Sequence, residues 1–89
     1  MSDMNANTIT VNVLFFGAAR DAAGVSEAML ETVAPASVMA LKESVYRKYE
    51  RVSHLATSLM VAVNEEYASD DTALKDQDVV AFLPPVSGG

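Results

Sequence analysis

Apolar and polar residues alternate along residues 8–16, and this pattern predicts a half-buried β-strand. One face of the strand is uniformly apolar and should point into the core: Ile9, Val11, Val13 and Phe15. The other face begins polar but ends with Leu14 and Phe16. Two interpretations of these two residues stay open here. They pack beneath a neighbouring loop, or they begin a partner-binding patch, because exposed apolar surface on a small domain often marks an interface.

Glycines divide the next segment into a helical turn and a second strand. Gly17 ends the first strand, residues 18–23 can form about one helical turn, and Gly24 closes that turn. Residues 26–33 predict a second strand with weaker alternation. The connection between the two strands is too long for a tight hairpin, so we expect a longer loop.

A helix is predicted after Ser37, which is a good N-cap, and it should run from Val38 to about Glu50. Apolar residues at helical spacing form its buried stripe: Val38, Leu41, Val45 and Tyr49. Four of the six basic residues cluster in the same region: Lys42, Arg47, Lys48 and Arg51. We interpret them as a helix face and as cations that favour the helix C-terminus, with a docking patch as the alternative.

The second half of the chain predicts two more long strands joined by turns. Residues 59–64 form an apolar strand, and residues 64–67 make a turn into a short edge segment. Residues 74–78 form a turn before the last strand, residues 79–83. Asp70-Asp71 supplies too few oxygen ligands for a hard cation, so we interpret this pair as a solvated acidic turn. His54 has no second His, Cys or nucleophile beside it, and we interpret it as a surface residue.

The last strand strengthens the hypothesis of a partner-binding patch. If Val80 and Phe82 fill the core, Leu83 emerges on the same open face as Leu14 and Phe16. Two strands would then place large apolar groups beside each other at the point where the last strand ends. This agreement favours the patch over packing beneath a loop.

The strand leads directly into Pro84-Pro85, and the chain ends on Gly88-Gly89. Proline cannot donate to a sheet ladder, so the two prolines should end the strand and direct the following residues outward. A fully extended segment from Pro84 to Gly89 would reach roughly 20 Å from the body. We therefore expect three parts: a flexible segment over residues 1–7, a folded domain over residues 8–84 and an extended tail over residues 85–89.

Composition restricts the function further. A chain of 89 residues, 51% hydrophobic and 20% charged, is expected to form one globular domain. The net charge of −6 argues against a nucleic-acid partner, and no apolar run is long enough for a membrane span. The chain has no cysteine, which excludes disulfides, thiolate metal sites and a cysteine nucleophile within it. With no signal peptide visible, we expect a cytoplasmic protein that binds no metal or other cofactor of its own.

The order of predicted elements is strand, strand, helix, strand, short edge strand, strand. One main helix packed on one face of a mixed sheet is the layout of an α+β, β-grasp (ubiquitin-like) roll. The strand order is supplied by analogy, since periodicity does not determine it.

Several segments resemble the small subunit of molybdopterin synthase, the MoaD-type sulfur carriers. They are residues 11–16, Arg20, residues 62–64 and above all residues 80–89, which read Val-Ala-Phe-Leu-Pro-Pro-Val-Ser-Gly-Gly. The ending is the specific part, and the resemblance extends over nearly the whole chain after residue 7. Three positions depart from the family's pattern. Gln77 replaces a frequent glycine and could change the geometry of its turn, while Leu83 replaces Phe and Ser87 replaces Thr.

The resemblance implies a function for the tail. An adenylyltransferase/sulfurtransferase would use ATP with Mg to adenylate Gly89, and sulfur from a cysteine desulfurase would convert the adenylate to a thiocarboxylate. The large synthase subunit would take up the tail, and sulfur would pass to cyclic pyranopterin monophosphate in molybdenum cofactor biosynthesis. The chain would then be the sulfur-donating part of a transferase, not catalytic alone, in a heterotetramer of two small and two large subunits.

The implied roles fall on two groups of residues. Gly89 carries the reactive group, and Gly88 keeps the approach to it unhindered. The expected partner contacts are Leu14, Phe16, Tyr67, Leu83, Pro84, Pro85, Val86 and Ser87. Other readings remain: a sulfur carrier for thiamin or tRNA thiolation, a ubiquitin-like modifier conjugated through Gly89, or an interaction module with an inert tail.

Overall fold

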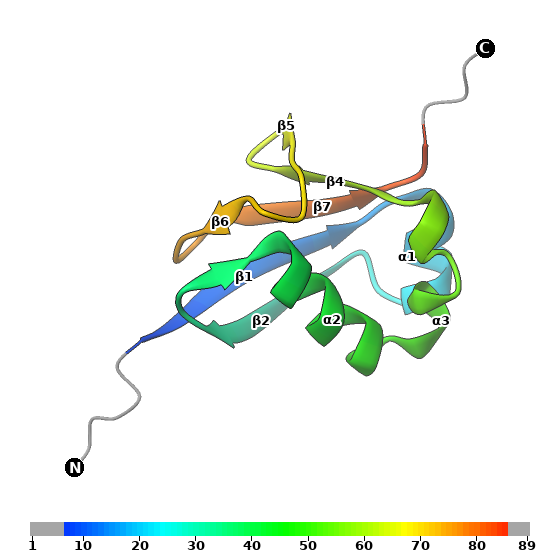
Figure 1. The fold of residues 1–89 in the computed structure, drawn as a ribbon. Helices are drawn as coiled ribbons and strands as arrows, with labels where there is room; N and C mark the ends of the chain where they lie inside the picture. The colour runs from blue at the N-terminus through cyan, green and yellow to red at the C-terminus, as the bar shows by residue number, and fades with distance from the viewer. Residues whose placement is uncertain (1–6, 86–89) are drawn as a thin grey trace.

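A mixed sheet covered on one face by helices forms the body of the computed structural model, which describes residues 7–85 (Figure 1). The elements in chain order are β1 (Thr8–Phe15), α1 (Gly17–Ala23), β2 (Glu27–Val33), β3 (Ala36–Ser37), α2 (Val38–Lys48), α3 (Glu50–Ser53), the 3₁₀ turn η1 (Ala56–Ser58), β4 (Met60–Val63), β5 (Glu66–Tyr67), β6 (Ala73–Leu74) and β7 (Val79–Leu83). The main sheet has the order β2-β1-β7-β4-β5, and β3 pairs with β6 in a separate ladder. This is the α+β, β-grasp layout that the order of elements predicted.

The first and last long strands lie side by side at the centre of the sheet. β1 and β7 run parallel, with Asn12 opposite Val79 and Phe15 opposite Phe82, whereas the other pairs are antiparallel. Parallel neighbours need a long crossover, which the whole chain from α1 to β6 supplies here. As a consequence, the end of β1 and the root of the C-terminal segment are neighbours.

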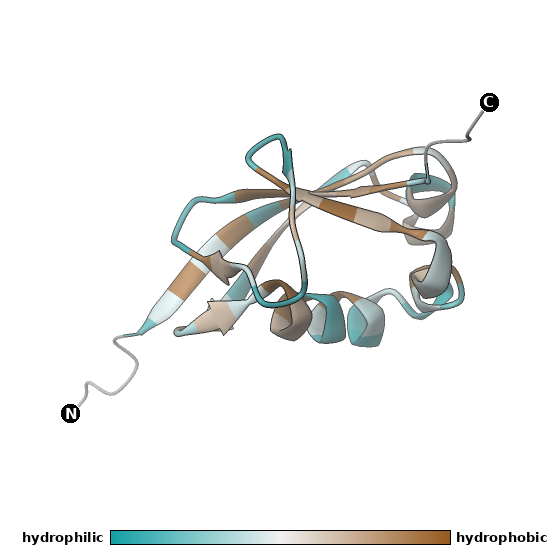
Figure 2. Ribbon diagram, turned by 45° about the horizontal axis from the view of Figure 1, so that its top comes forward, coloured by the Kyte–Doolittle hydropathy of each residue, from teal (hydrophilic) through white to brown (hydrophobic). Residues whose placement is uncertain are grey.

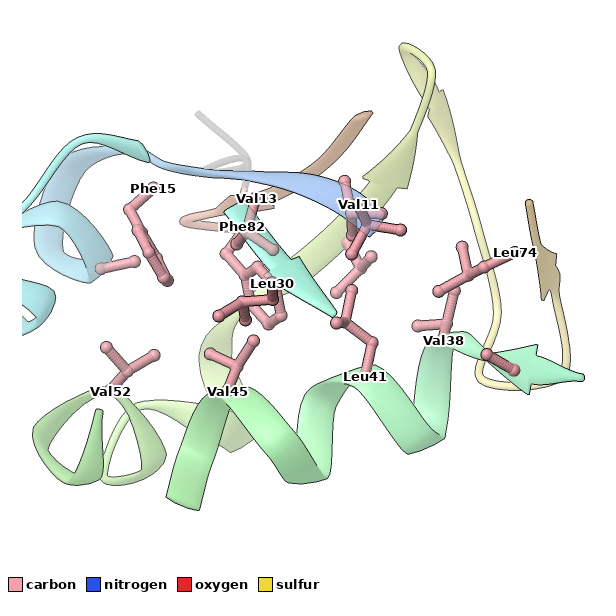
Figure 3. Close-up of a cluster of buried hydrophobic side chains, with 14 residues drawn as sticks. Val11, Val13, Phe15, Leu30, Val38, Leu41, Val45, Val52, Leu74 and Phe82 are labelled. Carbon is pink, nitrogen blue, oxygen red and sulfur yellow. The ribbon is translucent and has the colours of Figure 1, made fainter. Parts of the chain in front are cut away.

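The hydrophobic core lies between the sheet and α2 (Figure 3). The four β1 residues predicted to face inward contribute to it, three of them fully buried and Ile9 partly. Val80 and Phe82 of β7 are completely buried, as their alternation predicted. Burial of each such side chain contributes roughly 1.5–3 kcal/mol, so these strands and α2 hold the fold together.

The main helix begins where the sequence indicates but ends earlier. The Ser37 hydroxyl accepts a hydrogen bond from the Ala40 amide at 3.2 Å, which is the predicted N-cap. The helix stops at Lys48, because Tyr49 leaves helical geometry with φ −120° and ψ 80°, and α3 starts at Glu50. The helix therefore ends two residues before the predicted end at about Glu50. Tyr49 is only partly buried, although its ring packs edge-on against Phe15 with centroids 5.2 Å apart.

Other boundaries shift by a residue. Phe16 was predicted to lie in the first strand, but it is the N-cap of α1, which Gly24 closes with φ 80°. The ladder β3–β6 and the helix α3 were not predicted. The two strands have two residues each and the helix has four, which is too short for a periodic pattern in the sequence.

Hydropathy follows this layering. Figure 2 shows hydrophobic positions along the central strands and hydrophilic positions at the β4–β5 turn. No helix among residues 7–85 combines the length and the apolar character that a membrane crossing requires.

Candidate functional site

The open face of the sheet, on the side away from α2, carries an apolar hollow of about 370 Å³. Its lining residues come from β1, the β1–α1 corner, β4, the β4–β5 turn, β5 and β7: Leu14, Phe16, Ala62, Glu65, Tyr67, Val79, Ala81 and Leu83. Phe16 is 45% exposed and Tyr67 is 63% exposed, which is unusual for side chains of this size. Such exposed apolar surface is typical of an interaction site.

Strand register explains why a hollow forms here. Leu14 pairs with Ala81, Ala81 with Ala62, and Ala62 with Tyr67, so these four residues form one row across four strands. Directly paired residues place their side chains on the same face. The two alanines in the middle are short, and the larger side chains at either end rise above them. The surface along this row is therefore concave, with the two alanines at its bottom and Leu14 and Tyr67 at its sides.

The last described residues, Pro84 and Pro85, follow β7 at the edge of this hollow. The Phe16 amide donates a hydrogen bond to the Phe82 carbonyl at 3.1 Å, which extends the parallel ladder to the end of β7. Gly17, with φ 55°, lies so close to Pro84 that an added Cβ would be 3.1 Å from the proline Cγ. Pro84 and Pro85 are exposed. The β1–α1 corner thus contacts the chain at Pro84, directly after β7.

The structure brings Leu14, Phe16, Tyr67 and Leu83 into one hollow, with Pro84 next to it. Their role in binding a partner remains a prediction. Val86, Ser87, Gly88 and Gly89 lie outside the described residues. Four further residues line the hollow but were not predicted as partner contacts: Ala62, Glu65, Val79 and Ala81. An alanine gives no interface signal in a sequence, and the position of Glu65 depends on a turn conformation that alternation does not reveal.

That turn joins β4 to β5 in a two-residue hairpin. Asn64 and Glu65 have φ of 52° and 75°, and positive φ at both central positions is what a type I′ turn requires. The Asn64 side chain holds the turn against β7: its Oδ1 accepts from the Val79 amide and its Nδ2 donates to Asp78 Oδ1, both at 3.0 Å. Glu65 is consequently fixed at the rim of the hollow.

A second unusual turn precedes β7. Gln77 has φ 73°, and its amide donates to the Thr10 carbonyl at 2.6 Å, while the Thr10 amide donates to Asp76 Oδ1 at 2.7 Å. These bonds attach the turn to β1. Glycine adopts positive φ without steric cost, which is the physical reason that a glycine suits this position. The Gln77 side chain is accommodated in the same left-handed conformation.

Catalytic chemistry is sparse in the described part of the chain. No group of three potential metal ligands occurs among these residues. His54 is exposed, as predicted. Asp70 lies in the acidic turn and also forms an ion pair with α2, because Lys42 Nζ donates to its Oδ1 at 2.9 Å. The acid–base groups of residues 7–85 do not form a nucleophile–base pair, so the chemical interest lies in the hollow and the segment beside it.

Fold and site together define a β-grasp domain with an apolar hollow beside the end of its last strand. Residues 13–89 match the ThiS family. The chain belongs to the ThiS family.

Its relatives include sulfur carriers and modifiers. It is 38% identical over 82 residues to the molybdopterin synthase sulfur carrier subunit of Mycobacterium tuberculosis, covering 91% of this chain and 99% of that one. The fold is similar to that in the complex of subunits 1 and 2 of molybdopterin-converting factor from Helicobacter pylori (26% identity, TM-score 0.67, covering 91% of this chain and 100% of that chain). It is also similar to small archaeal modifier protein 1 from Methanosarcina acetivorans (27% identity, TM-score 0.79, covering 92% and 98%).

Proposed function

We propose that this chain is the sulfur carrier and small subunit of molybdopterin synthase. The observation that supports this most strongly is the apolar hollow next to the root of a segment that ends in Gly88-Gly89. The similarity to molybdopterin synthase sulfur carrier subunits over about nine-tenths of the chain supports the same function. A surface for docking and a terminal group for transfer are the two parts that a carrier needs.

The chemistry of the proposed reaction begins at the Gly89 carboxylate. A terminal carboxyl has a pKa of about 3.5, so near neutral pH it is an anion and a poor electrophile. An activating partner would use ATP with Mg to form the acyl-adenylate, with release of pyrophosphate. A sulfide equivalent then attacks the acyl carbon and displaces AMP, which leaves a thiocarboxylate; if the donor is a persulfide, the acyl disulfide that forms is cleaved by a thiol reductant, which supplies the two electrons. In the large synthase subunit this sulfur passes to cyclic pyranopterin monophosphate.

Glycine suits the last two positions for a physical reason. It has no Cβ, so the chain can enter a narrow channel and the terminal carbonyl is open to attack. A side chain at residue 89 would obstruct both the adenylating site and the transfer site. Pro84 and Pro85 restrict the conformations of the segment before it, and Val86 and Ser87 would contact the channel walls.

The body of the chain serves to position this end. Docking through Leu14, Phe16, Tyr67 and Leu83 would hold the glycines at high effective concentration in the partner's active site. The acid–base groups of the reaction come from the partners, so the chain is the sulfur-donating part of a transferase and not catalytic alone. We place it in the cytoplasm, in a heterotetramer of two small and two large subunits, with an adenylyltransferase/sulfurtransferase as its second partner.

Genetic rescue tests the pathway. The chain is expressed in cells that lack their own molybdopterin synthase small subunit, and the activity of a molybdoenzyme is measured. We expect activity to return with the full chain and not with a chain that lacks Gly89. A carrier for thiamin or tRNA thiolation would restore no molybdoenzyme activity, and that result would overturn the proposal.

The second candidate is a ubiquitin-like modifier, favoured by the similarity to small archaeal modifier protein 1. A modifier forms an isopeptide bond from Gly89 to lysines of other proteins. Immunoblots of cell extract would then show the chain in a ladder of higher-mass adducts. A sulfur carrier remains at its own mass.

A further inference from the structure

The hollow has carboxylates at its two ends and no lysine or arginine among its lining residues. Glu65 belongs to its lining, at the β4–β5 turn. Glu27 of β2 pairs with Leu14 across the β1–β2 ladder, which places its side chain on the same open face, at the opposite end of the row. Both residues are exposed, and neither side chain forms an ion pair or hydrogen bond within residues 7–85.

The charge of the whole sheet has one sign. β1, β2, β4, β5 and β7 contain no lysine or arginine, and their charged residues are all glutamates: Glu27, Glu31 and Glu66. Five of the six basic residues lie on the helices instead: Arg20, Lys42, Arg47, Lys48 and Arg51. The sixth, Lys75, follows β6. Lys75 lines a neighbouring hollow with Glu66 and Tyr67, but no lysine or arginine lines the apolar hollow itself.

Glu65 is also held in a conformation that disfavours it. Its φ of 75° is a left-handed value at which glycine, asparagine or aspartate is usual, and a longer side chain there costs roughly 1 kcal/mol. The turn is nevertheless held in place by the Asn64 bonds to Asp78 and Val79. Strained residues retained at a surface site are candidates for a functional role. The turn fixes the backbone position from which the Glu65 side chain extends at the hollow, while its carboxylate has no hydrogen-bond or ion-pair partner within residues 7–85.

We infer that the hollow selects its partner by charge: Glu27 and Glu65 pair with lysine or arginine side chains that flank an apolar projection on the large synthase subunit. This inference rests on the proposed function and names the chemistry of the surface that docks. Charged pairs at a rim act mainly on the association rate and on the rejection of wrong partners, and they weaken with added salt. The apolar residues provide the affinity, and the two carboxylates provide the selection.

The test is a titration of the carrier with the large subunit, by calorimetry or surface plasmon resonance, at low and high salt. The variants are Glu27→Gln, Glu65→Gln and the double variant. Glu65→Asn is added because asparagine tolerates positive φ and removes the charge without straining the turn. Glu43→Gln is the matched control, since it removes an exposed carboxylate from α2, on the other side of the molecule. Circular dichroism verifies that each variant is folded.

We expect the double variant to bind about 2–10-fold more weakly at low salt, with most of the difference lost in about 0.5 M salt. The control should bind like the unsubstituted chain. Equal loss in the control, or unchanged affinity in the double variant, overturns the inference and leaves the proposed function standing. A loss of affinity for the activating enzyme alone also overturns it. If the unsubstituted chain does not bind the large subunit at either salt concentration, both the inference and the proposed function fail.

Discussion

At the scale of single residues, Tyr46 is an exception to the rule that buried polar atoms are hydrogen-bonded. Its hydroxyl is buried and has no partner within the described part of the chain, while its ring packs edge-on against Phe82 at 6.2 Å. Burial is the main cause that raises the pKa of Tyr46 above its ordinary value; Lys42 lowers it and Asp70 raises it further. The ring stabilises the core, and the hydroxyl offsets part of that stabilisation.

Tyr46→Phe should keep the ring contact and remove the unpaired hydroxyl. We expect the free energy of unfolding near pH 7 to stay the same or rise by up to about 1 kcal/mol, measured by urea unfolding. Because the folded-state pKa is raised, the unfolded chain loses its proton first as the pH rises. The contribution of Tyr46 to the free energy of unfolding is therefore complete below pH 10.0, and it is lost as the pH rises through the folded-state pKa.

The variant should lack this alkaline loss. Tyr67→Phe is the control, because the Tyr67 side chain is 63% exposed and its replacement should change neither measurement. A clear loss of stability in Tyr46→Phe at neutral pH would show that the hydroxyl has a partner after all.

At the scale of elements, the long segments and the short edge strand β5 were predictable, whereas β3, β6 and α3 were not. The alternation of β1 and β7 identified both their buried faces, and Ser37 identified the start of α2. The row Leu14–Ala81–Ala62–Tyr67 could not be predicted, because the order β1-β7-β4-β5 comes from long-range pairing. The sequence indicated that Leu14, Phe16 and Leu83 share a face. It did not indicate that Ala81 and Ala62, between Leu14 and Tyr67, make that face concave.

The turn before β7 allows a direct test of backbone strain. Gln77→Gly should raise the free energy of unfolding by about 0.5–1 kcal/mol, because glycine removes the cost of positive φ while the amide bond to Thr10 remains. Urea unfolding measures the change. Lys75→Gly, in the same turn but without positive φ, should be destabilising and is the control. If both variants lose stability to the same extent, Gln77 is not strained.

At the scale of the whole molecule, the parallel pairing of β1 and β7 connects fold to function. It places the C-terminal end of β1 beside the C-terminal end of β7. The hollow is therefore adjacent to the point where the chain continues beyond β7. The helices occupy the opposite side and complete the core, which leaves this face available to a partner (Figure 1).

Phe16→Ala tests the hollow as a docking surface. Phe16 is nearly half exposed in the free chain, so its truncation should cost little stability, but it should weaken binding of the large subunit by about tenfold or more. Val33→Ala is the control, because Val33 is 72% exposed on the same sheet face but does not line the hollow. Unchanged affinity of Phe16→Ala in the titration would exclude the hollow as the docking site.

The central claim is that Gly89 carries sulfur, and the most direct measurement is the intact mass of the chain after incubation with ATP, Mg, the activating enzyme and a sulfur donor. The predicted result is one oxygen of the terminal carboxylate replaced by sulfur, and no change in a chain that lacks Gly89 but has the same thermal stability. An unchanged mass of the full chain, alongside a known carrier that is converted by the same enzyme, would contradict the account.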